Sequence, residues 1–214
     1  SKKGDIKFMG CDIHMHVEYK DFRGDRWFCG DYFTINPYYE ENNSDGELPY
    51  NLVDIYPNRN YSLFATLANV RNYGGTSYID EPRGLPDDVC VEVKKASDRI
   101  GDYGHSRSYF TLQELIDFQN KAKPLKHRGM ISPQAQINLD EKGILPDCWC
   151  QGTNEEGWQW RKWEESNKVL VSLIEIIKKR ASELYVIYDF LWEREPEKAY
   201  EKSKNIRIVF WFDN

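Results

Sequence analysis

The sequence predicts an α+β domain with a small, mainly antiparallel sheet that pairs an N-terminal strand with a C-terminal strand. Two strand-like runs, residues 11–19 and 205–214, lie near the two ends of the chain. Helical periodicity is clearest between them, over residues 60–71 and 163–194. Hydrophobic residues make up 40% and charged residues 30%, a composition typical of globular proteins. We expect helices packed on one face of the sheet, with long loop insertions between elements.

A chain of 214 residues can bury a substantial core, and we assign residues 9–214 to a single α+β domain. Residues 1–8 are polar and are expected to form an N-terminal extension. Residues 121–163 contain three prolines and little clear periodicity. We therefore expect this segment to be an insertion or lid within the domain.

The first strand has two unlike faces, because side chains alternate across a strand. One face is apolar and suits a core: Cys11, Ile13, Met15 and Val17. The opposite face carries carboxylates and imidazoles, here called the polar row: Asp12, His14, His16 and Glu18. Such a row can bind a divalent metal, transfer protons or hold polar groups of a ligand. The alternative is the exposed polar face of an edge strand.

Turn residues and periodicity organise the next segments. Residues 26–35 favour a second strand, in a hairpin with the first, and residues 36–58 favour a long surface loop. Apolar residues at positions i, i+1, i+4 and i+7 predict a helix over residues 60–71. A shorter helix is expected over residues 89–98, with acidic residues at its start.

Two segments offer groups that bind anions. Arg83 lies in a turn stiffened by prolines, where its guanidinium suits a phosphate or a carboxylate; the alternative is an internal ion pair. A glycine-containing loop, residues 101–109, precedes a helix whose start is marked by a capping box of Thr111 and Glu114. Three candidate ligand-binding residues lie in that loop, close to a helix start: His105, Ser106 and Arg107.

The last run, residues 205–214, is apolar, β-branched and aromatic, as is typical of a central strand covered on both faces. We expect it to lie beside the first strand. That pairing would bring Asp213 near Asp12 and His14, at one end of the polar row.

The composition of the chain bears on which partners the protein can bind and on where in the cell it works. The net charge of −6 argues against broad contact with a nucleic-acid polymer, although a local basic pocket can still hold a small phosphorylated ligand. Five cysteines without a second closely spaced pair argue against a closed zinc site and favour reduced thiols in the cytoplasm. No run of about 18 apolar residues is present, so no membrane partner is expected.

Several motifs together resemble a family of hypothetical proteins common in bacteriophages and prophages. The motifs are GCDIH at 10–14, NYSLF at 60–64, EPRGLPDD at 81–88, GHS at 104–106 and RIVFWFDN at 207–214. The resemblance spans residue 9 to the C-terminus. It implies an accessory phage protein, and by analogy one that counters host defence by acting on a nucleotide messenger.

Three functions are consistent with these residues, and we favour binding without turnover. In the first, a cytoplasmic homo-oligomer sequesters a phosphorylated, nucleotide-derived signal, held by Asp12, His14, Arg83, His105, Ser106 and Arg107. The second is a metal-dependent phosphodiesterase with Zn or Mn on Asp12, His14, His105 and Asp213, and with His16 or Glu18 as proton carrier. The third is a protein inhibitor of a host enzyme that uses the acidic segment 36–54 as its contact.

Overall fold

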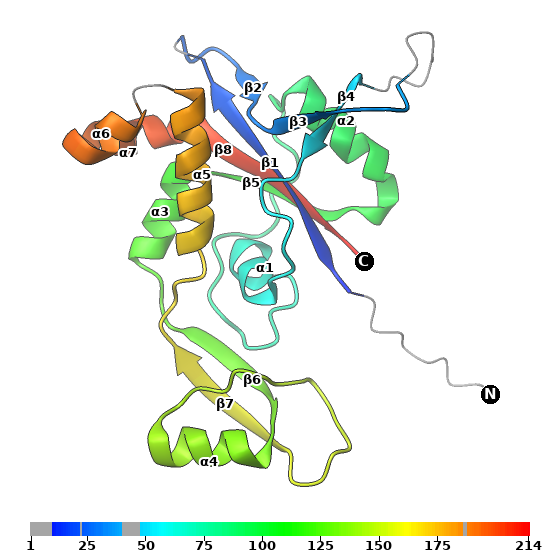
Figure 1. The fold of residues 1–214 in the computed structure, drawn as a ribbon, viewed down its shortest axis with the longest axis vertical. Helices are drawn as coiled ribbons and strands as arrows, with labels where there is room; N and C mark the ends of the chain where they lie inside the picture. Colours follow the sequence, from blue (N-terminus) through cyan, green and yellow to red (C-terminus); the bar gives the residue numbers. More distant parts are fainter. Residues whose placement is uncertain (1–9, 22, 40–47, 186–187) are drawn as a thin grey trace. The chain divides into compact units, whose positions relative to one another are not determined.

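The computed structural model describes residues 10–21, 23–39, 48–185 and 188–214. The predicted N-terminal extension and residues 40–47 of the predicted loop lie outside this description. The chain is α+β, and the strands near its two ends pair directly, as the sequence predicts (Figure 1). Its contacts divide it into two compact units. The sheet unit comprises the described parts of 1–60, 82–117 and 171–214, and the hairpin unit comprises 61–81 and 118–170.

A four-stranded antiparallel sheet forms the centre of the sheet unit, in the order β2-β1-β8-β5. The middle strands are β1 (Asp12–Lys20) and β8 (Ile206–Asp213), and the outer strands are β2 (Trp27–Cys29) and β5 (His105–Thr111). The prediction of a central C-terminal strand is confirmed, because β8 is buried along almost its whole length. β2 pairs with β1 only over residues 18–20, so most of the polar row has a ladder partner on the β8 side alone. The alternative of an exposed polar face is nevertheless wrong, because His16 and Glu18 are buried.

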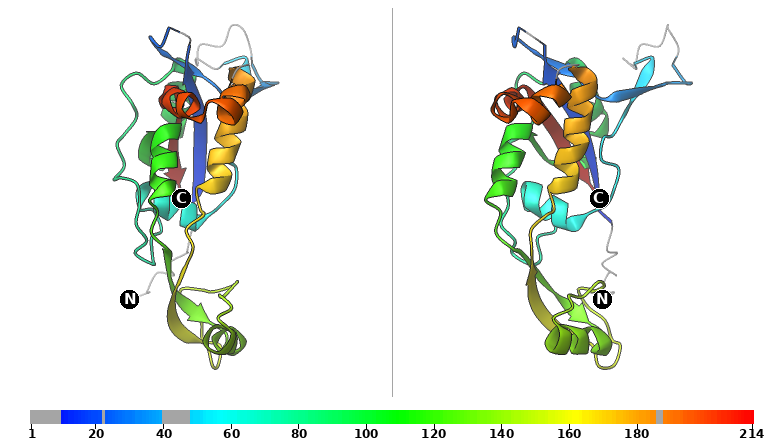
Figure 2. Two further views of the ribbon diagram at one scale, coloured as in Figure 1. Left: turned by 90° about the vertical axis from the view of Figure 1, so that its left-hand side faces the viewer. Right: turned by 60° about the vertical axis from the view of Figure 1, so that its left-hand side comes forward.

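One face of the sheet forms an apolar core. Residues that pair across β1 and β8 supply it: Ile13 with Phe212, Met15 with Phe210, and Val17 with Ile208. All six side chains are buried. Two helices lie beside this face, α5 (Val171–Leu184) and the start of α3 (Leu112–Asn120) (Figure 2).

The start of α3 confirms the predicted capping box. The backbone N–H of Thr111 donates to the Glu114 carboxylate at 2.7 Å, and the backbone N–H of Glu114 donates to Thr111 Oγ1 at 3.2 Å. Two backbone donors at the helix start are therefore satisfied by side chains three positions away along the chain.

The opposite face of the sheet carries the polar row, and α2 (Val91–Ile100) covers it. Val93 of α2 packs in one buried cluster with Val209 and Trp211 of β8. A separate two-stranded ladder, β3 (Tyr32–Ile35) with β4 (Tyr50–Val53), adds Leu52 to the same cluster. The sequence predicts helices on one face of the sheet. The structure also has a helix, α2, on the opposite face.

The hairpin unit is built on a two-stranded ladder. Its elements are α1 (Tyr61–Ala68), β6 (Leu125–Ile131), α4 (Pro133–Lys142) and β7 (Gln159–Glu165). The predicted insertion, residues 121–163, falls within this unit. Its expected irregularity is wrong, because the prolines lie where regular structure accepts them: Pro124 just before β6 and Pro133 at the first turn of α4. The single domain over 9–214 stays a prediction.

Several predicted secondary-structure elements differ from those in the structure. Residues 26–35 hold two short strands, because the chain leaves the sheet at Gly30, and residues 36–58 include β4. The predicted loop 101–109 contains η1 (Gly101–Tyr103) and most of β5. The predicted helical stretch 163–194 contains the end of β7, then α5 and α6 (Tyr188–Arg194); α7 (Pro196–Lys202) and η2 (Ser203–Asn205) follow. Among the described residues, no helix combines the length and apolar character needed to cross a membrane.

Candidate functional site

The polar row of β1 faces a row of β8 side chains, and the two rows form one face of the sheet. The pairs are Asp12 with Asp213, His14 with Trp211, His16 with Val209, and Glu18 with Arg207. Exposure falls along the row, from exposed Asp12 to Glu18 with none of its surface exposed. We call the Asp12–His14 end the open end and the Glu18 end the closed end.

His14 lies between two carboxylates at the open end. Its Nδ1 is 3.3 Å from Asp54 Oδ2, and its Nε2 is 3.1 Å from Asp213 Oδ2. The hydrogen bond to Asp54 is the main cause that raises the pKa of His14 from 6.5 to about 9; burial opposes this rise, and Asp213 adds to it. The imidazole is therefore protonated at neutral pH. The predicted approach of Asp213 to the polar row is confirmed.

His16 continues this arrangement toward the interior. Its Nδ1 is 2.7 Å from Asp31 Oδ2, and its Nε2 is 3.8 Å from Asp54 Oδ1. The other oxygen of Asp31 accepts the backbone N–H of Val17 at 2.7 Å. Burial raises the pKa of the Asp31 carboxyl, and the hydrogen bond from His16 partly offsets that rise. Carboxylates and imidazoles thus alternate from the surface to the core.

Trp211 lies against both histidines. Its ring stacks on His14 with centroids 6.1 Å apart and is tilted toward His16 with centroids 4.9 Å apart. Only 1% of the residue is exposed, yet its indole N–H has no hydrogen-bond partner among the described residues. A buried donor without a partner costs about 1–3 kcal/mol, so an acceptor at this position would be stabilising.

A cavity of about 410 Å³ opens at this end of the row. His14, His16 and Trp211 line it from the sheet, and the rest of the wall comes from 48–54, Pro57 and α2. The α2 side chains in the wall follow one helix face at spacings of three and four: Glu92, Lys95, Ala96, Arg99 and Ile100. Both cationic and apolar groups therefore face the same space.

Arg99 is the more exposed of the two α2 cations in the cavity wall, and within the described part of the chain it forms no ion pair. Lys95 is half-buried. Tyr50 also lines the cavity, and burial, with help from the nearby Glu92 carboxylate, raises the pKa of its hydroxyl. The wall can therefore offer charged donors to an anion and a neutral phenol to a second polar group.

The closed end of the row is fully occupied by internal contacts. Arg207 donates from Nε to Glu18 Oε2 at 2.6 Å and from Nη1 to Asp88 Oδ1 at 2.8 Å. The second oxygen of Glu18 accepts the backbone N–H of Cys90 at 2.7 Å, at the start of α2. Glu18 therefore anchors α2 to the sheet and is not placed to act as a proton carrier.

Two of the predicted ligand-binding residues are held in ion pairs. Asp12 receives a bidentate contact from Arg59, with both N···O distances at 2.8 Å. Arg83 donates to Glu114 at 2.8 Å and to the carbonyl of Tyr109 at 3.2 Å. The internal ion pair weighed as the alternative for Arg83 is therefore present. Of the predicted ligand-binding set, only His14 lines the cavity.

The predicted anion-binding loop is a strand with a bulge, which separates its side chains from the cavity. His105 pairs with Phe212 and stacks on its ring, so it lies on the face opposite to His14. Ser106 has a φ of 51° at the bulge, and its hydroxyl lies 3.0 Å from His105 Nδ1. Arg107 donates to Ser97 and to the carbonyls of Gly101 and Gly104, and so closes the end of α2.

The predicted metal set is divided in the same way. His14 and Asp213 are in contact, Asp12 is held by Arg59, and His105 lies on the other face of the sheet. No group of three or more His, Cys, Asp or Glu side chains within the described residues is arranged to hold a metal ion.

Comparison with known proteins adds no relative: no family model, curated protein or solved structure matches this chain. The candidate site therefore depends on geometry. Sequence reasoning missed Asp31, Asp54 and Trp211. The pairing of the terminal strands, which was predicted, places Trp211 opposite His14, so the register alone could have found it. Nothing local marks Asp54, because the strand that precedes it, β4, lies in a polar stretch that the sequence predicts to be a loop.

Proposed function

We propose that the sheet unit binds a small anionic ligand with a planar ring, of the size and chemistry of a nucleotide, at the open end of the polar row. The observation that carries this proposal is convergence on one cavity. Lys95 and Arg99, the protonated His14 and the ring of Trp211 all line the same cavity of about 410 Å³. Cavities of this size commonly hold small ligands.

The chemistry of each wall suggests how such a ligand would lie. Ammonium and guanidinium groups on α2 suit a phosphate or carboxylate, because hydrogen bonds between charged partners are short and strong. The Trp211 ring, which lines the cavity beside His14, offers an apolar surface to a planar ring of the ligand. His14 already donates to two carboxylates, so its part is to neutralise Asp54 and Asp213 and to keep the cavity from repelling an anion.

The resemblance to the phage and prophage family suggests what such binding would do in a host cell. We propose that the protein sequesters a nucleotide-derived signal in the cytoplasm of a host cell and thereby counters defence, acting as a homo-oligomer. Sequestration needs tight binding and no bond cleavage. The hydrolase alternative has less support, because its four ligands lie on two faces of the sheet. The inhibitor alternative depends on a segment partly outside the described residues.

Isothermal titration of the full chain tests the proposal with mononucleotides, cyclic nucleotides and cyclic ADP-ribose isomers as probes. We expect one of them to bind with a dissociation constant in about the micromolar range or below. Arg99→Glu should weaken that binding about tenfold or more, since it replaces an attractive charge by a repulsive one. Lys94→Glu is the matched control, because Lys94 lies on the same helix, outside the cavity wall, and pairs with Asp98.

Chromatography of the released probe separates binding from turnover. Recovery of the intact nucleotide supports sequestration, whereas recovery of a cleaved product supports the hydrolase and contradicts sequestration. Absence of binding to every probe up to about 1 mM would remove the nucleotide proposal. Equal losses in Arg99→Glu and Lys94→Glu would place any binding outside this cavity.

A further inference from the structure

The hairpin unit presents an exposed sheet face with a charge pattern that the fold does not explain. In the ladder of β6 and β7, Lys126 faces Glu164, Arg128 faces Lys162, and Met130 faces Trp160. Partners in an antiparallel ladder share a face. The charged side chains of this face and Trp160 are exposed.

Arg128 and Lys162 are like charges directly opposite each other. Such pairs destabilise a two-stranded ladder, whereas opposite charges stabilise it. Lys126, Arg128 and Lys162 form no ion pair with any residue that the structure describes. Glu164 lies opposite Lys126, but no carboxylate of the described ladder lies opposite Arg128 or Lys162, so an anion on this face would relieve their repulsion.

Aromatic rings flank the cations. Trp160 is 47% exposed, and the guanidinium carbon of Arg128 lies 5.2 Å from the centroid of its ring. Tyr73, which is 48% exposed, lines one cleft together with the three cations. Gly74 allows this approach, since a Cβ there would lie 1.8 Å from the carbonyl oxygen of Lys126.

A cleft of about 530 Å³ is lined by residues 73–75 and by residues of both strands of the ladder. Its described wall contains all three cations and a single carboxylate: Tyr73, Gly74, Gly75, Lys126, His127, Arg128, Lys162, Trp163 and Glu164. Although His127 and Trp163 also line the cleft, they belong to the opposite face of the ladder, where their rings pack together. Trp163 and His127 stack with centroids 5.4 Å apart, and both are buried.

We propose that this face of β6 and β7 binds a short stretch of single-stranded nucleic acid, independently of the cavity in the sheet unit. Phosphates would lie along Lys126, Arg128 and Lys162, and a base would stack on Trp160. Single strands are recognised in this way, by a cationic track beside exposed rings. Lys126 and Arg128 are two residues apart on one strand, so the charges form a row rather than converge on one phosphate. The net charge of −6 limits this contact to a short one.

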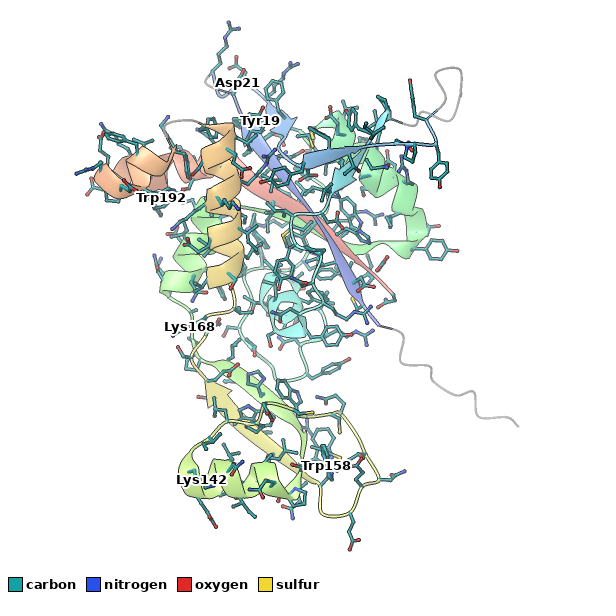
Figure 3. All side chains as sticks on the ribbon, in the orientation of Figure 1. Tyr19, Asp21, Lys142, Trp158, Lys168 and Trp192 are labelled. Carbon is teal, nitrogen blue, oxygen red and sulfur yellow. The ribbon has the colours of Figure 1, made fainter. Side chains whose placement is uncertain are left out.

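Fluorescence anisotropy of the full chain tests the proposal with labelled 12-residue uridine and thymidine oligonucleotides at low salt. Trp160→Ala should weaken binding about tenfold, and Trp160→Phe should restore part of it. Lys162→Ala should lower the slope of log K against log salt by about 0.7, the change expected for one lost phosphate contact. Lys142→Ala, at the end of α4 in the same unit, is the control and should leave both quantities unchanged (Figure 3).

Four outcomes would overturn the proposal. The first is no oligonucleotide binding up to about 100 μM protein at low salt. The second is equal effects of Lys142→Ala and Lys162→Ala, and the third is polyglutamate binding more tightly than the oligonucleotides, which would indicate an acidic protein partner. The fourth is uridine monophosphate binding as tightly as the oligonucleotide. Arg99→Glu should leave oligonucleotide binding intact, so the failure of one proposal does not decide the other.

Discussion

The two ends of the polar row both contain acidic and basic side chains, but these side chains have different roles at each end. At the closed end, Glu18 and Arg207 are buried, and both oxygens of Glu18 are used by the protein itself. At the open end, His14 lies between Asp54 and Asp213 with about 28% of its side chain exposed, and a cavity begins beside it.

The difference shows that residue type does not decide whether a polar row is structural or functional. What decides it is the element packed above the row. The start of α2 approaches the sheet closely enough for the backbone N–H of Cys90 to reach Glu18. Toward its end, α2 turns Lys95 and Arg99 to the cavity. A single row of charged side chains can thus anchor a helix at one end and border a candidate ligand site at the other.

Breaking the closed end should have the largest effect on stability. Arg207→Ala leaves the buried Glu18 carboxylate without its cation, and we expect the free energy of unfolding to fall by about 3–5 kcal/mol. Urea denaturation measures this loss. The double variant Glu18→Gln with Arg207→Met should recover much of it, because no buried charge remains and Gln still accepts from Cys90. A loss below about 1 kcal/mol in Arg207→Ala would show that this end does not anchor α2.

The middle of the row should be next in effect. Asp31→Ala removes the acceptor for His16 and for the backbone N–H of Val17, and we expect a loss of about 2 kcal/mol. Asp31→Asn keeps one carbonyl oxygen and should lose less. Thermal unfolding followed by circular dichroism compares the two variants. Equal melting temperatures for Ala and Asn would mean that the hydrogen bond to Val17 contributes little.

The sequence predicts the strands that support this site better than the side chains that line its cavity. Alternation along β1 and the apolar terminal run define two strands, and their pairing follows from burial on both faces. The capping box at Thr111 is equally local, and it is confirmed. These features depend on residues close in sequence or on one pair of strands, which is why patterns suffice for them.

The cavity wall depends on long-range packing, which patterns do not encode. Arg83 and Arg107 have the chemistry of anion binders, but Glu114 and the end of α2 lie near them in space and take their donors. The sequence predicts a loop at His105, whereas the structure has a strand there that places His105 on the face opposite to His14. Asp54 reaches His14 only because β4 precedes it, an element too short to be seen in a polar stretch.

At the open end, stability should depend on pH through His14. Its folded-state pKa of about 9 lies above the unfolded value of 6.5. The stabilisation is therefore complete below pH 6.5 and is lost as the pH rises through about 9. We expect a loss of about 1–2 kcal/mol over that interval, because the side chain is partly exposed. Denaturation of the parent and of His14→Gln at several pH values isolates this contribution, which the variant should lack.

Proton NMR of the His14 ring gives a direct measure of the same effect. Asp54→Asn removes the largest cause of the shift, so the midpoint of the titration should move from about 9 toward 6.5. Asp213→Asn should move it less. A midpoint that stays near 6.5 in the parent protein would contradict the arrangement of His14 between two carboxylates.

The smallest effect on stability is expected from a substitution of Arg83, which the sequence alone favours as an anion-binding residue. Its pair with Glu114 is partly exposed, and its guanidinium lies 4.5 Å from the centroid of Phe110. Arg83→Ala should therefore cost about 0.5–1 kcal/mol in stability and leave nucleotide binding unchanged. Urea denaturation and the titration used for Arg99→Glu measure both quantities. If Arg83→Ala instead weakens binding as strongly as Arg99→Glu, the ligand extends beyond the cavity to β5, and the boundary drawn here between supporting and binding residues is misplaced.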